Sequence, residues 1–124
     1  MRVRFALFSA YGRWLGAAAL ALAAAVPAIA QDYPTKSIQF VVPYPPGGAS
    51  DVVARTIGQK LSEAWKQPVV IENKPGANGI IALSHVAKSA PDGYTLLMGN
   101  VGPNAINPSI YKQPYDTAKD FQPI

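Results

Sequence analysis

Three glycine-rich segments hold the residues of this sequence best suited to binding a small molecule. They are centred on Gly47-Gly48, Gly76-Ala77-Asn78-Gly79 and Gly99-Asn100-Val101-Gly102. Glycine lets a ligand approach the backbone closely, and a neighbouring proline fixes the loop before binding, so that less entropy is lost. One such segment alone is more typical of a plain turn between a strand and a helix. Three of them at one edge of a sheet favour a binding site.

The spacing of these glycines differs from that of phosphate-binding loops. Gly47-Gly48 lacks the third glycine of the dinucleotide fingerprint, and the sequence contains no Gly-Lys-Ser or Gly-Lys-Thr. Free backbone N–H groups at the start of a helix, together with the positive end of the helix dipole, still attract an anion. We therefore expect the site to hold an anion, and we expect no cofactor.

Few residues are suited to catalysis. The only histidine, His85, falls inside a predicted helix and is interpreted as a surface or packing residue. Glu72 closes a predicted strand, but no second carboxylate stands at a spacing that supports acid–base chemistry. Asp51 has two interpretations, an anion that favours the start of a helix or a hydrogen-bond acceptor that faces a ligand. Because the chain also lacks cysteine and a Gly-x-Ser-x-Gly motif, we expect no catalytic residue and no metal site.

Hydrophobic patterns predict the elements that hold these segments in place. We expect strands at residues 38–42, 69–71 and 94–98, helices at residues 51–66 and 80–90, and a helical turn at residues 105–111. Strand, helix, strand, helix, strand gives two βαβ units, and right-handed crossovers place three parallel strands side by side. The fold class is therefore α/β. The ligand crevice of such a sheet lies beyond the carboxyl ends of the strands, where all three glycine-rich segments fall.

The first predicted helix illustrates the pattern. Its apolar residues recur at helical spacing and are expected to face the sheet; they are Val53, Ile57, Leu61, Ala64 and Trp65. Ser50 is the expected N-cap. The strands at residues 38–42 and 69–71 are apolar without alternation, which predicts that both are buried on two faces.

The first thirty residues have the three parts of a secretory signal. Arg2, Arg4 and Arg13 form a basic start, an apolar run spans residues 15–26, and small residues flank Ile29. We expect cleavage after Ala30 and export of the mature chain. The apolar run is shorter than the roughly 20 residues that a membrane span needs.

Removal of this segment also removes most of the net positive charge. The formal net charge of the whole chain is +4, whereas residues 31–124 have eight Lys and Arg against seven Asp and Glu. A nearly neutral domain without clustered basic residues lacks the electrostatic basis for binding nucleic acid.

Several motifs, in order, resemble one known family. They are Val41-Val42-Pro43-Tyr44-Pro45-Pro46-Gly47-Gly48-Ala49-Ser50-Asp51, then Val69-Val70-Ile71-Glu72-Asn73-Lys74-Pro75-Gly76-Ala77-Asn78-Gly79, then Ala90-Pro91-Asp92-Gly93-Tyr94-Thr95, and Pro114-Tyr115-Asp116 with Lys119-Asp120-Phe121. The chain from Tyr33 to Ile124 is similar to the N-terminal part of the substrate-binding receptors of tripartite tricarboxylate transporters, the Bug receptor family.

The resemblance implies a periplasmic receptor whose two α/β lobes close on an organic acid and deliver it to integral-membrane permease subunits. The acid is a di- or tricarboxylate, an amino acid or an aromatic acid. Carried onto this sequence, the ligand-binding residues are Tyr44, Gly47, Gly48, Ser50, Asp51, Pro75, Gly76, Ala77, Asn78 and Gly79. The geometry of the sheet adds Asn100.

This sequence departs from the family in length. Family members are longer and have a second lobe, so residues 31–124 are expected to form an incomplete first lobe with little ligand affinity of its own. Two other functions stay open, an exported α/β hydrolase or isomerase acting on a small carboxylate compound and a small exported interaction domain. The lack of an activated nucleophile favours binding over chemistry.

Overall fold

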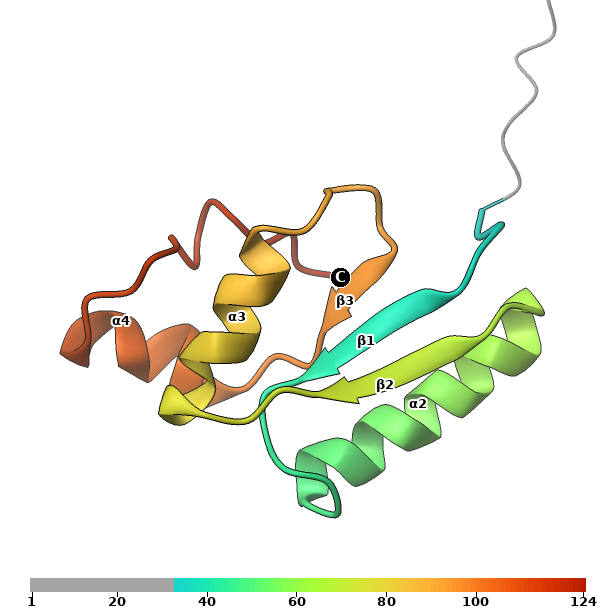
Figure 1. Ribbon diagram of the computed structural model, residues 1–124, viewed down its shortest axis with the longest axis horizontal. Coiled ribbons are helices and arrows are strands. Elements are labelled where there is room, and N and C mark those ends of the chain that lie inside the picture. Colours follow the sequence, from blue (N-terminus) through green and yellow to red (C-terminus); the bar gives the residue numbers. More distant parts are fainter. Residues whose placement is uncertain (1–32) are drawn as a thin grey trace, which may run out of the picture. The chain divides into compact units, whose positions relative to one another are not determined.

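A computed structural model of the chain describes residues 33–124 (Figure 1). The expected signal segment and its cleavage after Ala30 lie outside these residues. The described elements are β1 (Ile38–Val42), α2 (Ala49–Trp65), β2 (Val69–Asn73), the 3-10 turn η1 (Ala77–Gly79), α3 (Ile80–Ala87), β3 (Thr95–Leu97), the π-helical segment η2 (Gly102–Ile106) and α4 (Asn107–Ile110). Within this part of the chain, no helix has the length and apolar character needed to cross a membrane.

The three strands form one parallel sheet in the order β2-β1-β3, which confirms the expected α/β class. Phe40 on β1 is in register with Ile71 on β2 and with Leu96 on β3. Since all three strands run the same way, the loops that follow them leave from one edge of the sheet.

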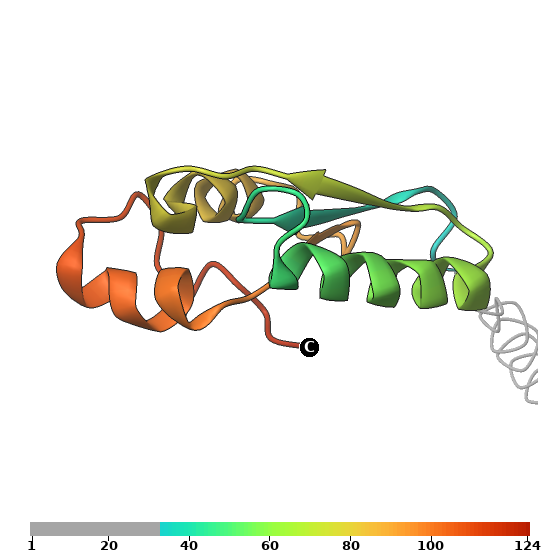
Figure 2. The same ribbon diagram turned by 90° about the horizontal axis from the view of Figure 1, so that it is seen from below.

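Helices cover both faces of the sheet. Phe40 and Val42 of β1 pack with Ala54 of α2 on one face, and Figure 2 shows α2 lying along this side of the strands. Val41 packs with Ala82 and Leu83 of α3 on the other face. Tyr115 and Phe121 extend this second cluster. Alternate residues of β1 therefore belong to two separate cores, as the pleat of a strand requires.

The buried face of α2 differs from the one expected. The helix buries Asp51, Ala54 and Gly58, whereas Val53 and Ile57 are 45% and 42% exposed. A Cβ atom on Gly58 would lie 3.0 Å from Cδ1 of Ile71, so the absence of a side chain lets α2 approach β2 closely. Small residues, not the large apolar ones, therefore mark the contact with the sheet.

Two further expectations need correction. The strand at residues 69–71 was expected to be buried, but β2 is an edge strand of the described sheet, and Val70 is 53% exposed. Ser50 was expected to cap the first helix, but α2 begins at Ala49 with Gly48 as its N-cap, so that Ser50 lies in the first turn. The helix begins two residues earlier than expected because Gly48 adopts the extended conformation that an N-cap needs.

The central packing gives a prediction for stability. Leu83 is fully buried against Val41, so Leu83→Ala removes apolar contacts and leaves a cavity. We expect a loss of about 2–5 kcal/mol in the free energy of unfolding, measured by urea titration. The control Ile110→Ala, at an exposed position, should cost about 0.5 kcal/mol or less. Equal losses would contradict the packing described for α3.

Candidate functional site

The loop between β1 and α2 lines a shallow pocket of about 580 Å³ at the carboxyl edge of the sheet. Five residues predicted from the sequence contribute to it: Tyr44, Gly47, Gly48, Ser50 and Asn100. Asn100 follows β3, which lies beside β1, so the parallel sheet brings its side chain to the β1 loop. Pro45, Pro46 and Ala49 complete the lining.

The start of α2 supplies backbone donors to this pocket. Gly48 is the N-cap and forms no side-chain hydrogen bond, while its carbonyl accepts the first intrahelical bond from Val52 N at 3.0 Å. The first N–H groups of a helix have no intrahelical partner, and the helix dipole places positive charge there. Gly48, Ala49 and Ser50 therefore surround a position where an anion is favoured.

The second predicted loop and the β1 loop each place one polar atom near Gly102. A Cβ atom on Gly102 would lie 3.6 Å from the Tyr44 hydroxyl and 3.9 Å from Asn78 Oδ1. Pro75, Gly76 and Ala77 are exposed beside them, whereas Gly79 is buried against Pro43 and Pro103. The structure thus brings Asn78 and Tyr44 to the same glycine, but none of the predicted residues of the second loop, 75–79, lines the pocket.

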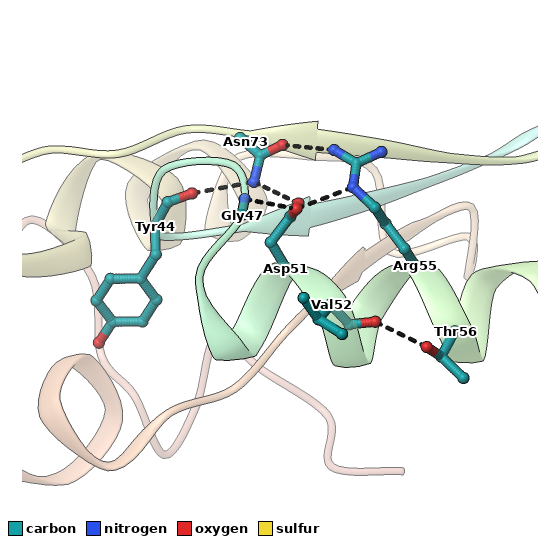
Figure 3. Close-up of polar contacts among 7 residues, drawn as sticks. All are labelled: Tyr44, Gly47, Asp51, Val52, Arg55, Thr56 and Asn73. Carbon is teal, nitrogen blue, oxygen red and sulfur yellow. Dashed lines mark hydrogen bonds and ion pairs between the residues drawn. The ribbon is translucent and has the colours of Figure 1, made fainter.

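The carboxylate of Asp51 organises the β1 loop (Figure 3). Its Oδ2 accepts hydrogen bonds from Gly47 N and Arg55 Nε, each at 2.9 Å, and its Oδ1 accepts one from Asn73 Nδ2 at 2.9 Å. Asn73 Nδ2 also donates to the Tyr44 carbonyl at 3.0 Å. The side chain therefore joins the loop, the first turns of α2 and the end of β2.

These contacts also fix the ionisation of Asp51. The hydrogen bonds from Arg55, Gly47 and Asn73, in that order of importance, hold the pKa of the carboxyl well below its usual range. Arg55 forms an ion pair with it across one turn of the helix. The negative charge beside the pocket is thereby compensated.

Asn107 has a similar role at the second loop. It is fully buried, its Oδ1 accepts a hydrogen bond from Asn78 Nδ2 at 2.6 Å, and its Nδ2 donates to the Asn78 carbonyl at 2.9 Å. Asn78 has a left-handed backbone, with φ of 52°. Sequence reasoning did not select Asn73 or Asn107, because an asparagine in a loop has no local signal that separates a buried anchor from an exposed turn residue.

The side chains considered for catalysis lie elsewhere. Glu72 pairs with Lys74 and accepts a hydrogen bond from Gln39 on the neighbouring strand, and the bond from Lys74 is the main cause that lowers the pKa of its carboxyl. His85 lies on α3, and its buried Nε2 has no hydrogen-bond partner within residues 33–124. Neither residue lines the pocket. In the described range, no three His, Cys, Asp or Glu side chains are grouped in a way that would hold a metal ion.

Two glycines of the loops differ in a testable way. Gly47 and Gly79 both have positive φ, of 84° and 88°, but a Cβ on Gly47 meets nothing within 4 Å, whereas one on Gly79 lies 2.9 Å from Pro103 Cβ. We expect Gly47→Ala to cost about 1 kcal/mol of unfolding free energy, from backbone strain alone. Gly79→Ala adds overpacking against a rigid ring and should cost about 2–4 kcal/mol. Urea titration of both variants makes the comparison, and similar losses would refute the close contact.

The lowered pKa of Asp51 predicts a pH dependence. The pKa of Asp51 is lower in the folded than in the unfolded chain. The contribution of the ionised carboxylate to the free energy of unfolding is therefore fully present at neutral pH and declines as the pH falls below about 4. The stability difference between the wild-type chain and Asp51→Asn should therefore be largest at pH 7 and narrow toward pH 3. The control Asp92→Asn removes a half-exposed carboxylate whose pKa is lowered mainly by the Tyr94 N–H. The pH-dependent difference in unfolding free energy between this variant and the wild-type chain should be smaller. An Asp51→Asn difference that stays constant with pH would be inconsistent with the ionised network.

Curated relatives and solved structures are similar to this chain in sequence and in fold. Protein BugT of Bordetella pertussis is 43% identical over 102 residues, a match that covers 81% of this chain and 31% of BugT. MatC (Rpa3494) from Rhodopseudomonas palustris, solved with bound malate, is 39% identical with a TM-score of 0.70 over 73% of this chain and 31% of MatC. R. palustris Rpa4515, solved with adipate, is 44% identical with a TM-score of 0.67 over 69% of this chain and 29% of Rpa4515.

The chain spans about a third of the length of these relatives. The structural matches confirm the expected α/β lobe of a solute-binding protein. Residues 53–124 match the family described as the tripartite tricarboxylate transporter family receptor. The chain therefore belongs to the tripartite tricarboxylate transporter receptor family, the family that includes the Bug proteins.

Proposed function

We propose that this chain supplies the first lobe of a periplasmic receptor that captures an organic carboxylate for a tripartite tricarboxylate transporter. The observation that carries the proposal is the pocket at the uncapped start of α2, where Tyr44 and Asn100 stand beside the backbone donors of Gly48 to Ser50. Cleavage of the first 30 residues delivers the receptor to the periplasm. The partners are the membrane permease subunits.

The proposed ligand contacts follow from the chemistry of a carboxylate. Its two oxygens accept hydrogen bonds from the N–H groups of Gly48, Ala49 and Ser50, and the helix dipole stabilises its charge. Asn100, which lines the pocket, offers a further donor, and the Tyr44 hydroxyl lies near Gly102. Each charge-assisted hydrogen bond contributes about 1.5–3 kcal/mol, so three to five of them approach the roughly 8 kcal/mol of a micromolar site.

The ligand class is supported by two solved relatives. Rpa4515 was solved with adipate and MatC with malate, and both ligands are dicarboxylates. One carboxylate would bind at the start of α2. The rest of the ligand would extend beyond this loop toward the other parts of a complete receptor, which would determine selectivity.

The test uses a chimera in which residues 33–124 replace the matched segment of Rpa4515, which supplies the rest of a complete receptor. We expect calorimetry to show adipate binding by the chimera. Gly48→Val should weaken this binding at least 10-fold, because the valine side chain would occupy the carboxylate position at the start of α2. Gly48 has φ of −79°, and a Cβ there would come no closer than 3.7 Å to its own chain, so the fold should tolerate the change.

The control is Ala64→Val, which creates the same side chain at an exposed position near the other end of α2, outside the pocket lining. It should leave adipate affinity within about twofold of the unmodified chimera. A folded chimera that binds neither adipate nor malate would refute the carboxylate assignment. Unchanged affinity in Gly48→Val would show that the ligand does not bind at the start of α2.

A further inference from the structure

Two polar side chains are buried within residues 33–124, and each is bonded to a different loop of the candidate site. Asp51 is 3% exposed and Asn107 is fully buried. Burying a polar group costs free energy unless it is hydrogen-bonded, so such groups persist where their bonds hold a particular backbone shape. Both side chains are therefore placed where they fix a loop from inside the fold.

Asp51 holds the β1 loop at two points. It accepts the Gly47 N–H directly, and it orients Asn73, whose amide holds the Tyr44 carbonyl. Gly47 has a positive φ, and its N–H is directed inward to the carboxylate. The loop between Tyr44 and Gly47 is thus tied at both ends to one buried group.

Asn107 holds the second loop at a single residue. It accepts a hydrogen bond from the Asn78 side chain and donates one to the Asn78 carbonyl, so both the side chain and the backbone of Asn78 are fixed. Asn78 Oδ1 is thereby held near Gly102. The segment that contains Asn107 belongs to neither loop.

We propose that Asp51 and Asn107 are positioning residues that set the shape of the two loops from the interior, and that neither touches the ligand. Both carboxylate oxygens of Asp51 are already bonded within the chain, and neither residue lines the pocket. A carboxylate facing an anionic ligand would also repel it. The inference rests on the proposed carboxylate function and replaces the ligand-facing interpretation of Asp51.

The first arm of the test measures amide hydrogen exchange in the full 124-residue chain and needs no ligand. Asp51→Ala should raise exchange of the Gly47 amide at least 10-fold and leave the Gly79 amide, which bonds the Gly76 carbonyl, within threefold. Asn107→Ala should raise exchange of the Gly79 amide at least 10-fold and leave exchange of the Gly47 amide within threefold. The Met98 amide, bonded to Val41 in the sheet, should keep its protection in both variants, whereas a general loss of fold would expose all three amides.

A conservative variant covers the case in which alanine unfolds the chain. Asp51→Asn keeps the size of the side chain and one acceptor oxygen. It should restore protection of the sheet and leave the Gly47 amide exchanging at least threefold faster than in the wild-type chain. Wild-type exchange at Gly47 in this variant would overturn the role given to the carboxylate.

The second arm measures adipate binding in the Rpa4515 chimera. Asp51→Ala and Asn107→Ala should each weaken binding at least 10-fold, while Asp92→Ala, which removes a half-exposed carboxylate paired with Lys36, should change it less than twofold. Binding within twofold of the unmodified chimera in either test variant overturns the proposal for that residue.

Lost binding in Asp51→Ala with unchanged Gly47 exchange also overturns the proposal for Asp51, because Asp51 would then act on the ligand itself. An unmodified chimera that binds no dicarboxylate refutes the proposed function, and the exchange arm still decides the positioning role.

Discussion

The strand β1 is the constraint on which the other described elements depend. Within residues 33–124 it is hydrogen-bonded on one edge to β2 and on the other to β3, and its alternate side chains enter two different cores. Val41 and Val42 are fully buried on opposite faces. Because β1 fixes both neighbours in parallel register, it also fixes where their carboxyl ends, and therefore the three glycine-rich segments, come together.

Where the three loops come together, they form the candidate site, and their backbone polar groups also need hydrogen-bond partners. Loops that turn away from a buried strand carry N–H and carbonyl groups that the sheet no longer pairs, and each must find another partner or water. Asp51 bonds the Gly47 N–H, Asn73 bonds the Tyr44 carbonyl, and Asn107 bonds the Asn78 carbonyl. The groups satisfied in this way face inward. The start of α2 has no side-chain cap, and Gly48, Ala49 and Ser50 line the pocket, so the interior of the β1 loop is fixed while the start of the helix stays open to the proposed ligand.

The order of elements, the parallel sheet and the positions of the loops could be predicted from the sequence, because short apolar runs and Gly-Pro segments are local signals. The contact face of α2 could not, since it depends on how closely Gly58 fits against β2 and Ala54 against β1. Val70 is as apolar as a core residue, yet it lies on an edge strand. Within the site, the pocket joins Asn100 to the β1 loop as the sheet geometry predicts. The roles of Asn73 and Asn107 could not be predicted, because both side chains bond to residues that are distant in the sequence.

The magnitudes show why interior anchors matter for a site built from backbone donors. Ordering one residue costs about 1–2 kcal/mol of backbone entropy, so a flexible loop of five or six residues would cost on the order of 5–12 kcal/mol if the ligand had to order it. Three hydrogen bonds to a carboxylate contribute only about 5–9 kcal/mol, which such a cost would cancel. The bonds made by Asp51 and Asn107 form during folding and hold the loops before a ligand arrives. A loop that is already ordered leaves nearly all of the hydrogen-bond energy for affinity, and this gain requires no contact between the anchors and the ligand.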